Sequence, residues 1–264
     1  MTKLQIGVLV SAVAFFCLLY FGCDTKPKAH QQIEEQRAMN SESTNIAALL
    51  KDAKSSMDAN QATAILGMET QLQNAAQDSM KIENLKLLAG KWFEFGHPEI
   101  SGFYAQQIAE MEENSETAWS IAGTTYTICV QRTKVEKVKS FCTERAVKAF
   151  ESAISLNPSN VAHRTNLALL YTENPPENNP MQGILMLVDL NKQYPEDIGV
   201  LTNLGRLSLK TGQFDKAVQR LEKVLTLEPD NVDATCMLAS VYQELRQQDK
   251  AAALQEKCAA LSQR

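Results

Sequence analysis

The side chains best suited to chemistry are few in this sequence, and they lie far apart along the chain. The three histidines, His30, His97 and His163, share no spacing that would let them hold one metal ion. The sequence also contains no glycine-rich phosphate loop, no nucleophile elbow and no CxxC motif. Without a convergent set of titratable groups, no residue is placed to act as nucleophile, acid or base. We therefore expect no catalytic residue, no cofactor and no bound metal, and we predict that the protein is not an enzyme.

One stretch of the chain concentrates positive charge. Between Cys129 and Lys148, six basic residues accompany two glutamates, although the net charge of the chain is −5. Two interpretations remain open: a solvated helical extension, or a docking surface for an acidic partner or anionic headgroups. The overall acidity weighs against nucleic acid as a partner, because phosphate binding needs clustered Lys and Arg. We call this stretch the basic insertion, and its candidate binding residues are Arg132, Lys134, Lys137 and Lys139.

Residues 198–231 contain two predicted amphipathic helices joined by a tight turn. Apolar and small residues recur at helical spacing in both halves. Gly212 suits the left-handed conformation that ends the first helix, and Pro229 stops the second. Gly205 and Ala217 are small enough to let the two backbones cross closely. The stretch is therefore a helical hairpin, and the composition, with 44% hydrophobic residues, 11 Gly and 8 Pro, suits an all-α globular chain.

This hairpin resembles the tetratricopeptide repeat, a 34-residue helix–turn–helix unit. The same pattern recurs in phase, so we expect five repeats at 82–115, 116–160, 161–197, 198–231 and 232–264. The second carries the basic insertion, and the last has Arg246 where a turn glycine is expected. Residues 45–80 are interpreted as capping helices or a degenerate repeat. The resemblance implies an all-α solenoid, wound as a right-handed superhelix around a concave groove.

In this family the groove is lined by set positions of the first helix of each repeat. In the first repeat, these positions hold Lys86, Gly90, Phe93 and Glu94. Arg206 and Lys210 lie one turn apart and are the best anion-binding candidates in the groove. The C-terminal helix has no helix after it, so we expect its apolar edge to contact a partner or a second copy of the chain. The groove residues that the resemblance selects as protein-binding are Lys86, Thr124, Thr165, Asn203, Arg206, Lys210 and Gln243.

Four cysteines lie in the predicted repeats. Cys129 and Cys142 bracket most of the basic insertion, and in an oxidising compartment they would close a loop of about 14 residues, stabilising the fold by roughly 3 kcal/mol. The alternative is a pair of buried apolar thiols. In the last repeat, we interpret Cys258 as a core residue and Cys236 as groove-facing, and we expect both to be unpaired.

The N-terminus is expected to tether the protein to a membrane. Residues 4–22 are uncharged and almost entirely apolar, which is long enough for a bilayer-spanning helix. We predict that residues 1–23 form a signal anchor or a lipoprotein signal with lipidation at Cys23, and that residues 24–44 form a linker. Basic residues flank the apolar stretch on both sides, so they do not determine its orientation. We expect export, with the repeats on the periplasmic side of a bacterial envelope.

These features favour a membrane-anchored scaffold of the cell envelope that binds peptide segments or folded partners in its groove. A second hypothesis is an assembly chaperone of c-type cytochrome maturation that presents apocytochrome, because anchored repeat proteins of similar layout do this. A third is an import receptor on an organelle membrane with its repeats in the cytosol. The fold alone does not choose among these functions.

Overall fold

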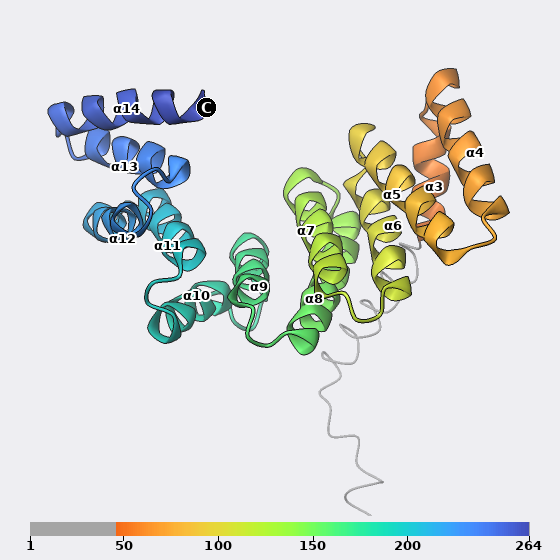
Figure 1. Cartoon of the computed structure of the whole chain (residues 1–264), viewed down its shortest axis with the longest axis horizontal. Coiled ribbons are helices and arrows are strands. Elements are labelled where there is room, and N and C mark those ends of the chain that lie inside the picture. Colours follow the sequence, from red (N-terminus) through yellow and green to blue (C-terminus); the bar gives the residue numbers. More distant parts are fainter. Residues whose placement is uncertain (1–45, 264) are drawn as a thin grey trace, which may run out of the picture. The chain divides into compact units, whose positions relative to one another are not determined.

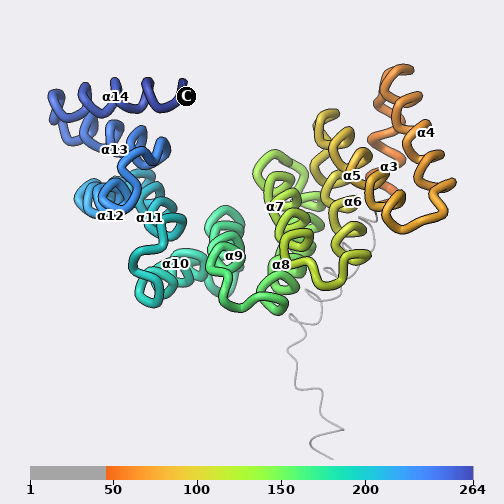
Figure 2. Tube along the Cα trace, viewed as in Figure 1, coloured from red at the N-terminus to blue at the C-terminus, as the bar shows by residue number. Residues whose placement is uncertain are grey.

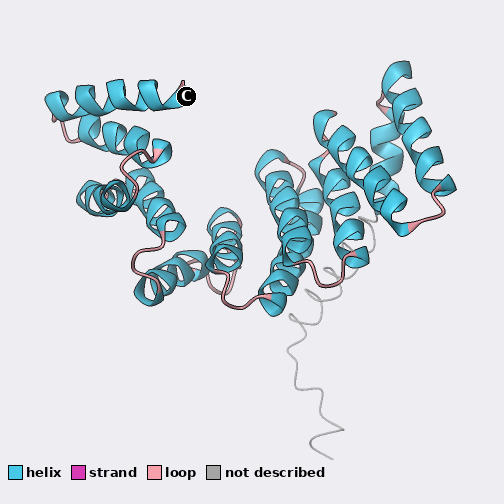
Figure 3. Cartoon of the chain, in the orientation of Figure 1, coloured by secondary structure: helices cyan, strands magenta, loops and turns pink. Residues whose placement is uncertain are grey.

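The computed structural model describes residues 46–263, and this part of the chain is all-helical, with twelve helices and no strand (Figures 1 and 3). The proposed membrane segment 1–23, the lipidation site Cys23 and the linker 24–44 lie outside the described residues. Among the helices that are described, none combines the length and apolar character needed to cross a membrane.

The helices follow one another as antiparallel pairs joined by short turns (Figure 2). The chain packs α5 against α6, α7 against α8, α9 against α10, α11 against α12 and α13 against α14, and each pair also contacts the next. The five hairpins are α5 (Asp78–Glu94) with α6 (Pro98–Met111), α7 (Glu116–Arg132) with α8 (Glu136–Leu156), α9 (Val161–Glu173) with α10 (Gln182–Gln193), α11 (Ile198–Lys210) with α12 (Phe214–Leu227), and α13 (Val232–Glu244) with α14 (Gln248–Ser262).

A polar residue begins the first helix of each hairpin from the second onward. The side chains of Ser115, Asn160, Asp197 and Asn231 each accept a hydrogen bond from a backbone N–H in the first turn of the helix that follows. Such caps satisfy donors that have no partner inside the helix. The caps therefore fix where each hairpin starts, whatever the length of the connection before it.

Left-handed residues end the first helix in three of the hairpins. Gly96 has φ +84° and Gly212 has φ +70°, which glycine adopts without steric cost. The corresponding residue of the last hairpin is Arg246, with φ +59°. The fifth turn therefore has the same left-handed residue as the first and fourth turns, without the glycine that suits it.

The cores of the hairpins depend on small residues where two helices cross. A Cβ atom on Gly205 would lie 2.7 Å from the side chain of Leu221, and one on Gly123 would lie 2.7 Å from the ring of Phe150. Gly183 is more constrained, because its Cβ would meet the backbone of Ala168 and Thr172 rather than a movable side chain. Close crossing of this kind lets the large residues Trp92, Tyr126 and Phe150 become completely buried.

The two helices that precede the first hairpin, α3 (Ile46–Ser55) and α4 (Ala59–Asn74), have different partners. Helix α4 packs on α5, as the second helix of a preceding repeat would, whereas α3 packs on α6. Ile46 and Leu49 of α3 contact both the core cluster around Trp92 and the cluster around Tyr126. Helix α3 therefore runs beside the first two hairpins and joins their cores.

Both cysteine pairs of the repeats are disulfide-bonded. Cys129 at the end of α7 is bonded to Cys142 near the start of α8, with their Cα atoms 6.2 Å apart and both side chains buried. Cys236 of α13 is bonded to Cys258 of α14. Our expectation that these last two cysteines are unpaired is therefore wrong. They lie eleven residues before and eleven after Gln247 in the turn, and antiparallel helices bring such residues to the same level.

Candidate protein-binding groove

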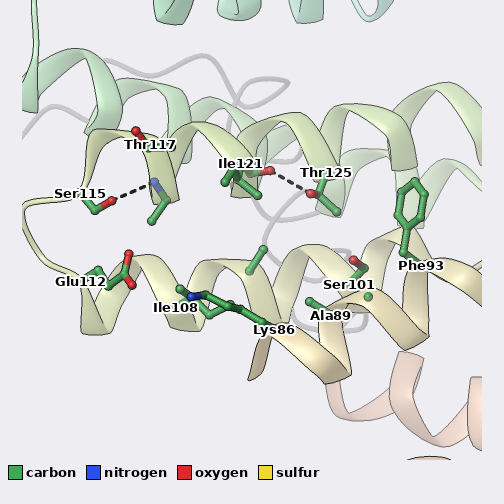
Figure 4. A pocket seen from close by; sticks show the side chains of 13 residues that line it. Lys86, Ala89, Phe93, Ser101, Ile108, Glu112, Ser115, Thr117, Ile121 and Thr125 are labelled. Carbon is green, nitrogen blue, oxygen red and sulfur yellow. Dashed lines mark hydrogen bonds between the residues drawn. The ribbon is translucent and has the colours of Figure 1, made fainter. Parts of the chain in front are cut away.

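A pocket of about 530 Å³ lies between the first helices of the first two hairpins, α5 and α7, above α6 (Figure 4). The later first helices, α7, α9, α11 and α13, each pack on the next, but α5 and α7 do not pack closely together. Small and apolar side chains form most of the pocket surface, including Ala89, Ala105, Ile108, Ala118 and Ile121. Gly90 also lines it, and a Cβ atom added there would meet no atom within 4 Å.

Both helices that border the pocket carry an exposed apolar side chain, as other helices of the described residues also do. Ile121 of α7 lines the pocket and is 56% exposed, and Leu87 of α5, next to the lining residue Lys86, is 53% exposed. An isolated exposed apolar residue needs no explanation, but one that lines an apolar pocket indicates a contact surface.

The two ends of the pocket differ in chemistry, as Figure 4 shows. Phe93 lies at one end, where the guanidinium carbon of Arg132 is 5.1 Å from the centroid of its ring. Glu112 and Ser115 lie at the other end, in the connection between α6 and α7. Lys86 lies between them on α5 and forms an ion pair with Glu83.

A second, more polar pocket of about 270 Å³ continues the first across α7 toward α9. Its lining includes the hydroxyl-bearing residues Thr117, Ser120 and Thr124 together with His163, whose side chain is 5% exposed. His163 Nε2 is 3.3 Å from a carboxylate oxygen of Glu116. Burial by itself raises the pKa of Glu116, but hydrogen bonds from His163, Asn160 and Asn157 and the charge of His163 outweigh it, so the pKa lies below its ordinary value.

The groove residues chosen from the sequence fall into different environments. Lys86 lines the first pocket and Thr124 the second, so the structure brings these two onto neighbouring surfaces. Thr165 is only 5% exposed, so its selection as an open groove residue needs correction: its helix is packed between neighbours on both sides. Lys210 and Gln243 are exposed on later hairpins.

Arg206, one of the two anion-binding candidates, already has partners. Its Nη1 donates a hydrogen bond of 3.0 Å to Asn203 Oδ1, and its Nη2 is 3.9 Å from a carboxylate oxygen of Asp233 on the next hairpin. The Asn203 side chain in turn donates to the Gly199 carbonyl. Arg206 therefore links two hairpins, and its charge is partly compensated, which makes it a weaker anion site than its position in the sequence indicates.

The basic insertion lengthens the second hairpin at its turn. Arg132 ends α7, Lys134 lies in the turn, and Lys137 and Lys139 lie in the first turns of α8. The disulfide between Cys129 and Cys142 joins the two helices across this extension. Through Arg132 and Phe93, the extension reaches the edge of the first pocket.

Several pocket residues are not among the positions chosen from the sequence. On α7 the first pocket is lined by Thr117, Ala118, Ile121 and Thr125, a face rotated by about one residue from the positions that the family pattern selects. Ile121, an aliphatic residue that shares a helix face with Thr117 and Thr125, is the sequence signal that could have marked this face.

Comparison with known families gives a match where the hairpin pattern is most regular. Residues 208–257 match a tetratricopeptide-repeat family model, and this segment holds all of α12 and α13, most of α14 and the turns between them. Residues 208–257 therefore belong to the tetratricopeptide-repeat family. No curated protein matches the chain.

Several solved structures are similar to this chain at low sequence identity. PilW, a widely conserved type IV pilus biogenesis factor, is 19% identical, with a TM-score of 0.48 over 72% of this chain and 80% of PilW. MamA from Desulfovibrio magneticus RS-1 is 17% identical, with a TM-score of 0.44 over 72% of this chain and 98% of that chain. YrrB, described as having an unusual peptide-binding site, is 17% identical, with a TM-score of 0.39 over 77% of this chain and 92% of that chain.

Proposed function

We propose that this tetratricopeptide-repeat protein is a non-enzymatic scaffold of the cell envelope that holds a segment of a partner protein in the pocket between α5 and α7. The observation that carries the proposal is the pocket itself, an apolar hollow of about 530 Å³ lined by the exposed side chain of Ile121. A hollow of this size accommodates more than one large side chain. Burying Ile121 against a partner would also remove apolar surface from water.

The two disulfides support a location outside the cytosol. Disulfides persist in oxidising compartments such as the bacterial periplasm and are rare where thioredoxin and glutathione keep thiols reduced. Both cysteine pairs join the two helices of one hairpin, so they fit a stabilising role. Together with the apolar sequence at residues 4–22, they favour an exported, N-terminally anchored protein whose repeats face the oxidising side.

The partner can be sought by photo-crosslinking in intact cells from a photoreactive residue at position 121. The proposal expects a discrete crosslinked protein that disappears when Gly90→Trp fills the pocket. The matched control is Gly67→Trp, because Gly67 on α4 also has open space around its Cβ position but lies outside the pocket. Capture that is equal in all three backgrounds, or no capture, would contradict binding in this pocket.

The identity of the captured protein separates the scaffold from the more specific chaperone hypothesis. Capture of an apocytochrome would favour the cytochrome-maturation role, whereas another envelope protein would favour a general scaffold. The compartment is tested in the same cells with a membrane-permeant maleimide reagent that adds mass to free thiols. Labelling of Cys129, Cys142, Cys236 and Cys258 before reduction would contradict an oxidising compartment.

A further inference from the structure

The charges along the groove change sign from one end of the pocket to the other. At the Phe93 end lie Arg132, which packs over the Phe93 ring, and exposed Lys134 in the adjoining turn. At the opposite end, Glu112 lines the pocket and exposed Glu113 follows it. The apolar surface therefore lies between a cationic end and an anionic end.

The cationic end keeps most of its charge. Lys91 and Glu94 are near Phe93 in sequence, but they form an ion pair of 2.7 Å and largely cancel each other. Lys86 is likewise paired with Glu83. Arg132 and Lys134, in contrast, form no ion pair with any residue that the structure describes, so their charges are available to a ligand. The contact with Phe93 also holds the Arg132 guanidinium at the mouth of the pocket.

From the opposite charges at the two ends of the pocket, we propose which kind of segment binds there and which way round it lies. This inference rests on the proposed function. The partner is a protein segment that places a large apolar side chain in the pocket beside Gly90 and carries acidic residues on the side that reaches Arg132 and Lys134. Acidic residues at the opposite end would meet Glu112 and Glu113 and be repelled. The apolar side chain supplies affinity, and the charges set direction and partner choice.

The first test is a selection of random twelve-residue peptides displayed on phage, with the immobilised full chain as target and the Gly90→Trp variant for counter-selection. Peptides that depend on the pocket are expected to share one large apolar residue with Asp or Glu enriched on one side of it. Pocket-dependent peptides without acidic enrichment would overturn this inference and leave the proposed function standing. If no peptide depends on the pocket, both are wrong.

The second test reverses the two charges and follows the binding of one selected peptide by fluorescence anisotropy. Arg132→Glu combined with Lys134→Glu is expected to weaken binding about five- to tenfold at low salt and to flatten its salt dependence, because two exposed charge pairs are lost. The matched control is Lys51→Glu combined with Lys148→Glu, which reverses two exposed charges outside the pocket lining and is expected to bind as the wild type does. Equal loss in both variants would contradict the inference.

Two other occupants would give different results. If the basic end binds a membrane, vesicles containing phosphatidylglycerol will displace the peptide from the wild type but not from the variant that combines Arg132→Glu with Lys134→Glu. The peptide's acidic residues will then not affect its affinity. If the occupant is a second copy of this chain, the full chain will self-associate in sedimentation and Gly90→Trp will abolish the association. Either result would overturn the proposal of an acidic partner segment.

Discussion

Arg132 lies over the ring of Phe93, with its guanidinium carbon 5.1 Å from the ring centroid. Phe93 is near the end of α5 and Arg132 ends α7, so this contact joins the first helices of two successive hairpins that otherwise do not pack closely. It places the Arg132 guanidinium beside Phe93, which lines one end of the pocket. The extended second hairpin, which the sequence marks as a charged insertion, is thereby connected to the surface proposed to bind the partner.

Two glycines with opposite surroundings should respond oppositely to the same substitution. Gly183→Ala is expected to destabilise the fold by about 1–3 kcal/mol, since its Cβ would press on the backbone of Ala168 and Thr172. Gly90→Ala should stabilise it by about 0.5–1 kcal/mol, because its Cβ would enter open space within a helix. Urea unfolding of the two variants measures both changes, and equal effects would contradict the crossing geometry at Gly183.

Arg246 has a left-handed backbone that favours glycine. Arg246→Gly is expected to stabilise the last hairpin by about 1 kcal/mol, which would raise the melting temperature by about 2–4 °C. The reciprocal variant Gly212→Arg should lower it by a similar amount, because Gly212 has the same conformation in the preceding hairpin. Thermal unfolding followed by circular dichroism tests the pair, and a lower melting temperature for Arg246→Gly would be inconsistent with this turn.

The two disulfides should differ in their resistance to reductant. Cys129 and Cys142 are buried, whereas Cys236 and Cys258 are partly exposed. Mild dithiothreitol should therefore reduce the pair in α13 and α14 first, as read by mass spectrometry after alkylation. Replacing both Cys129 and Cys142 by Ala should cost about 3 kcal/mol of stability. Simultaneous reduction of the two pairs would argue against this difference in burial.

Glu116 should make stability depend on pH in a defined direction. Its pKa in the folded protein lies below the ordinary value of 4.5, because hydrogen bonds from His163, Asn160 and Asn157 outweigh the effect of burial. The stabilising contribution of Glu116 is therefore complete above about pH 4.5 and is lost as the pH falls through the lower folded-state pKa. Glu116→Gln should lack this part of the pH dependence, measured as the urea midpoint against pH. Identical profiles for the two proteins would exclude the effect.

The helical repeats could be predicted because several independent features of the sequence indicate the same helices and turns. Small residues such as Gly205 and Ala217 recur where helices cross, and turn glycines such as Gly212 end the first helices. The recurring caps at Ser115, Asn160, Asp197 and Asn231 add the same information, since they begin the helices after connections of unequal length.

The cysteine pairing and the pocket needed three-dimensional information. Cys236 and Cys258 were assigned to different faces from helical spacing alone, but their equal distance from Gln247 brings them together in the hairpin. The family pattern gives the general position of the groove but not the rotation of α7, so Ile121 was not selected although it lines the pocket. Arg206 remains a predicted groove residue, but a pattern within one repeat cannot reveal its contact with Asp233 in the next.

The most direct measurement for the central claim is the affinity of the protein captured at position 121 for the purified full chain and for its two tryptophan variants, by isothermal titration calorimetry. The account predicts that Gly90→Trp, which fills the pocket, weakens binding by at least about tenfold, whereas Gly67→Trp on α4 binds as the wild type does. Unchanged affinity in a correctly folded Gly90→Trp protein would contradict the claim that the pocket between α5 and α7 holds the partner.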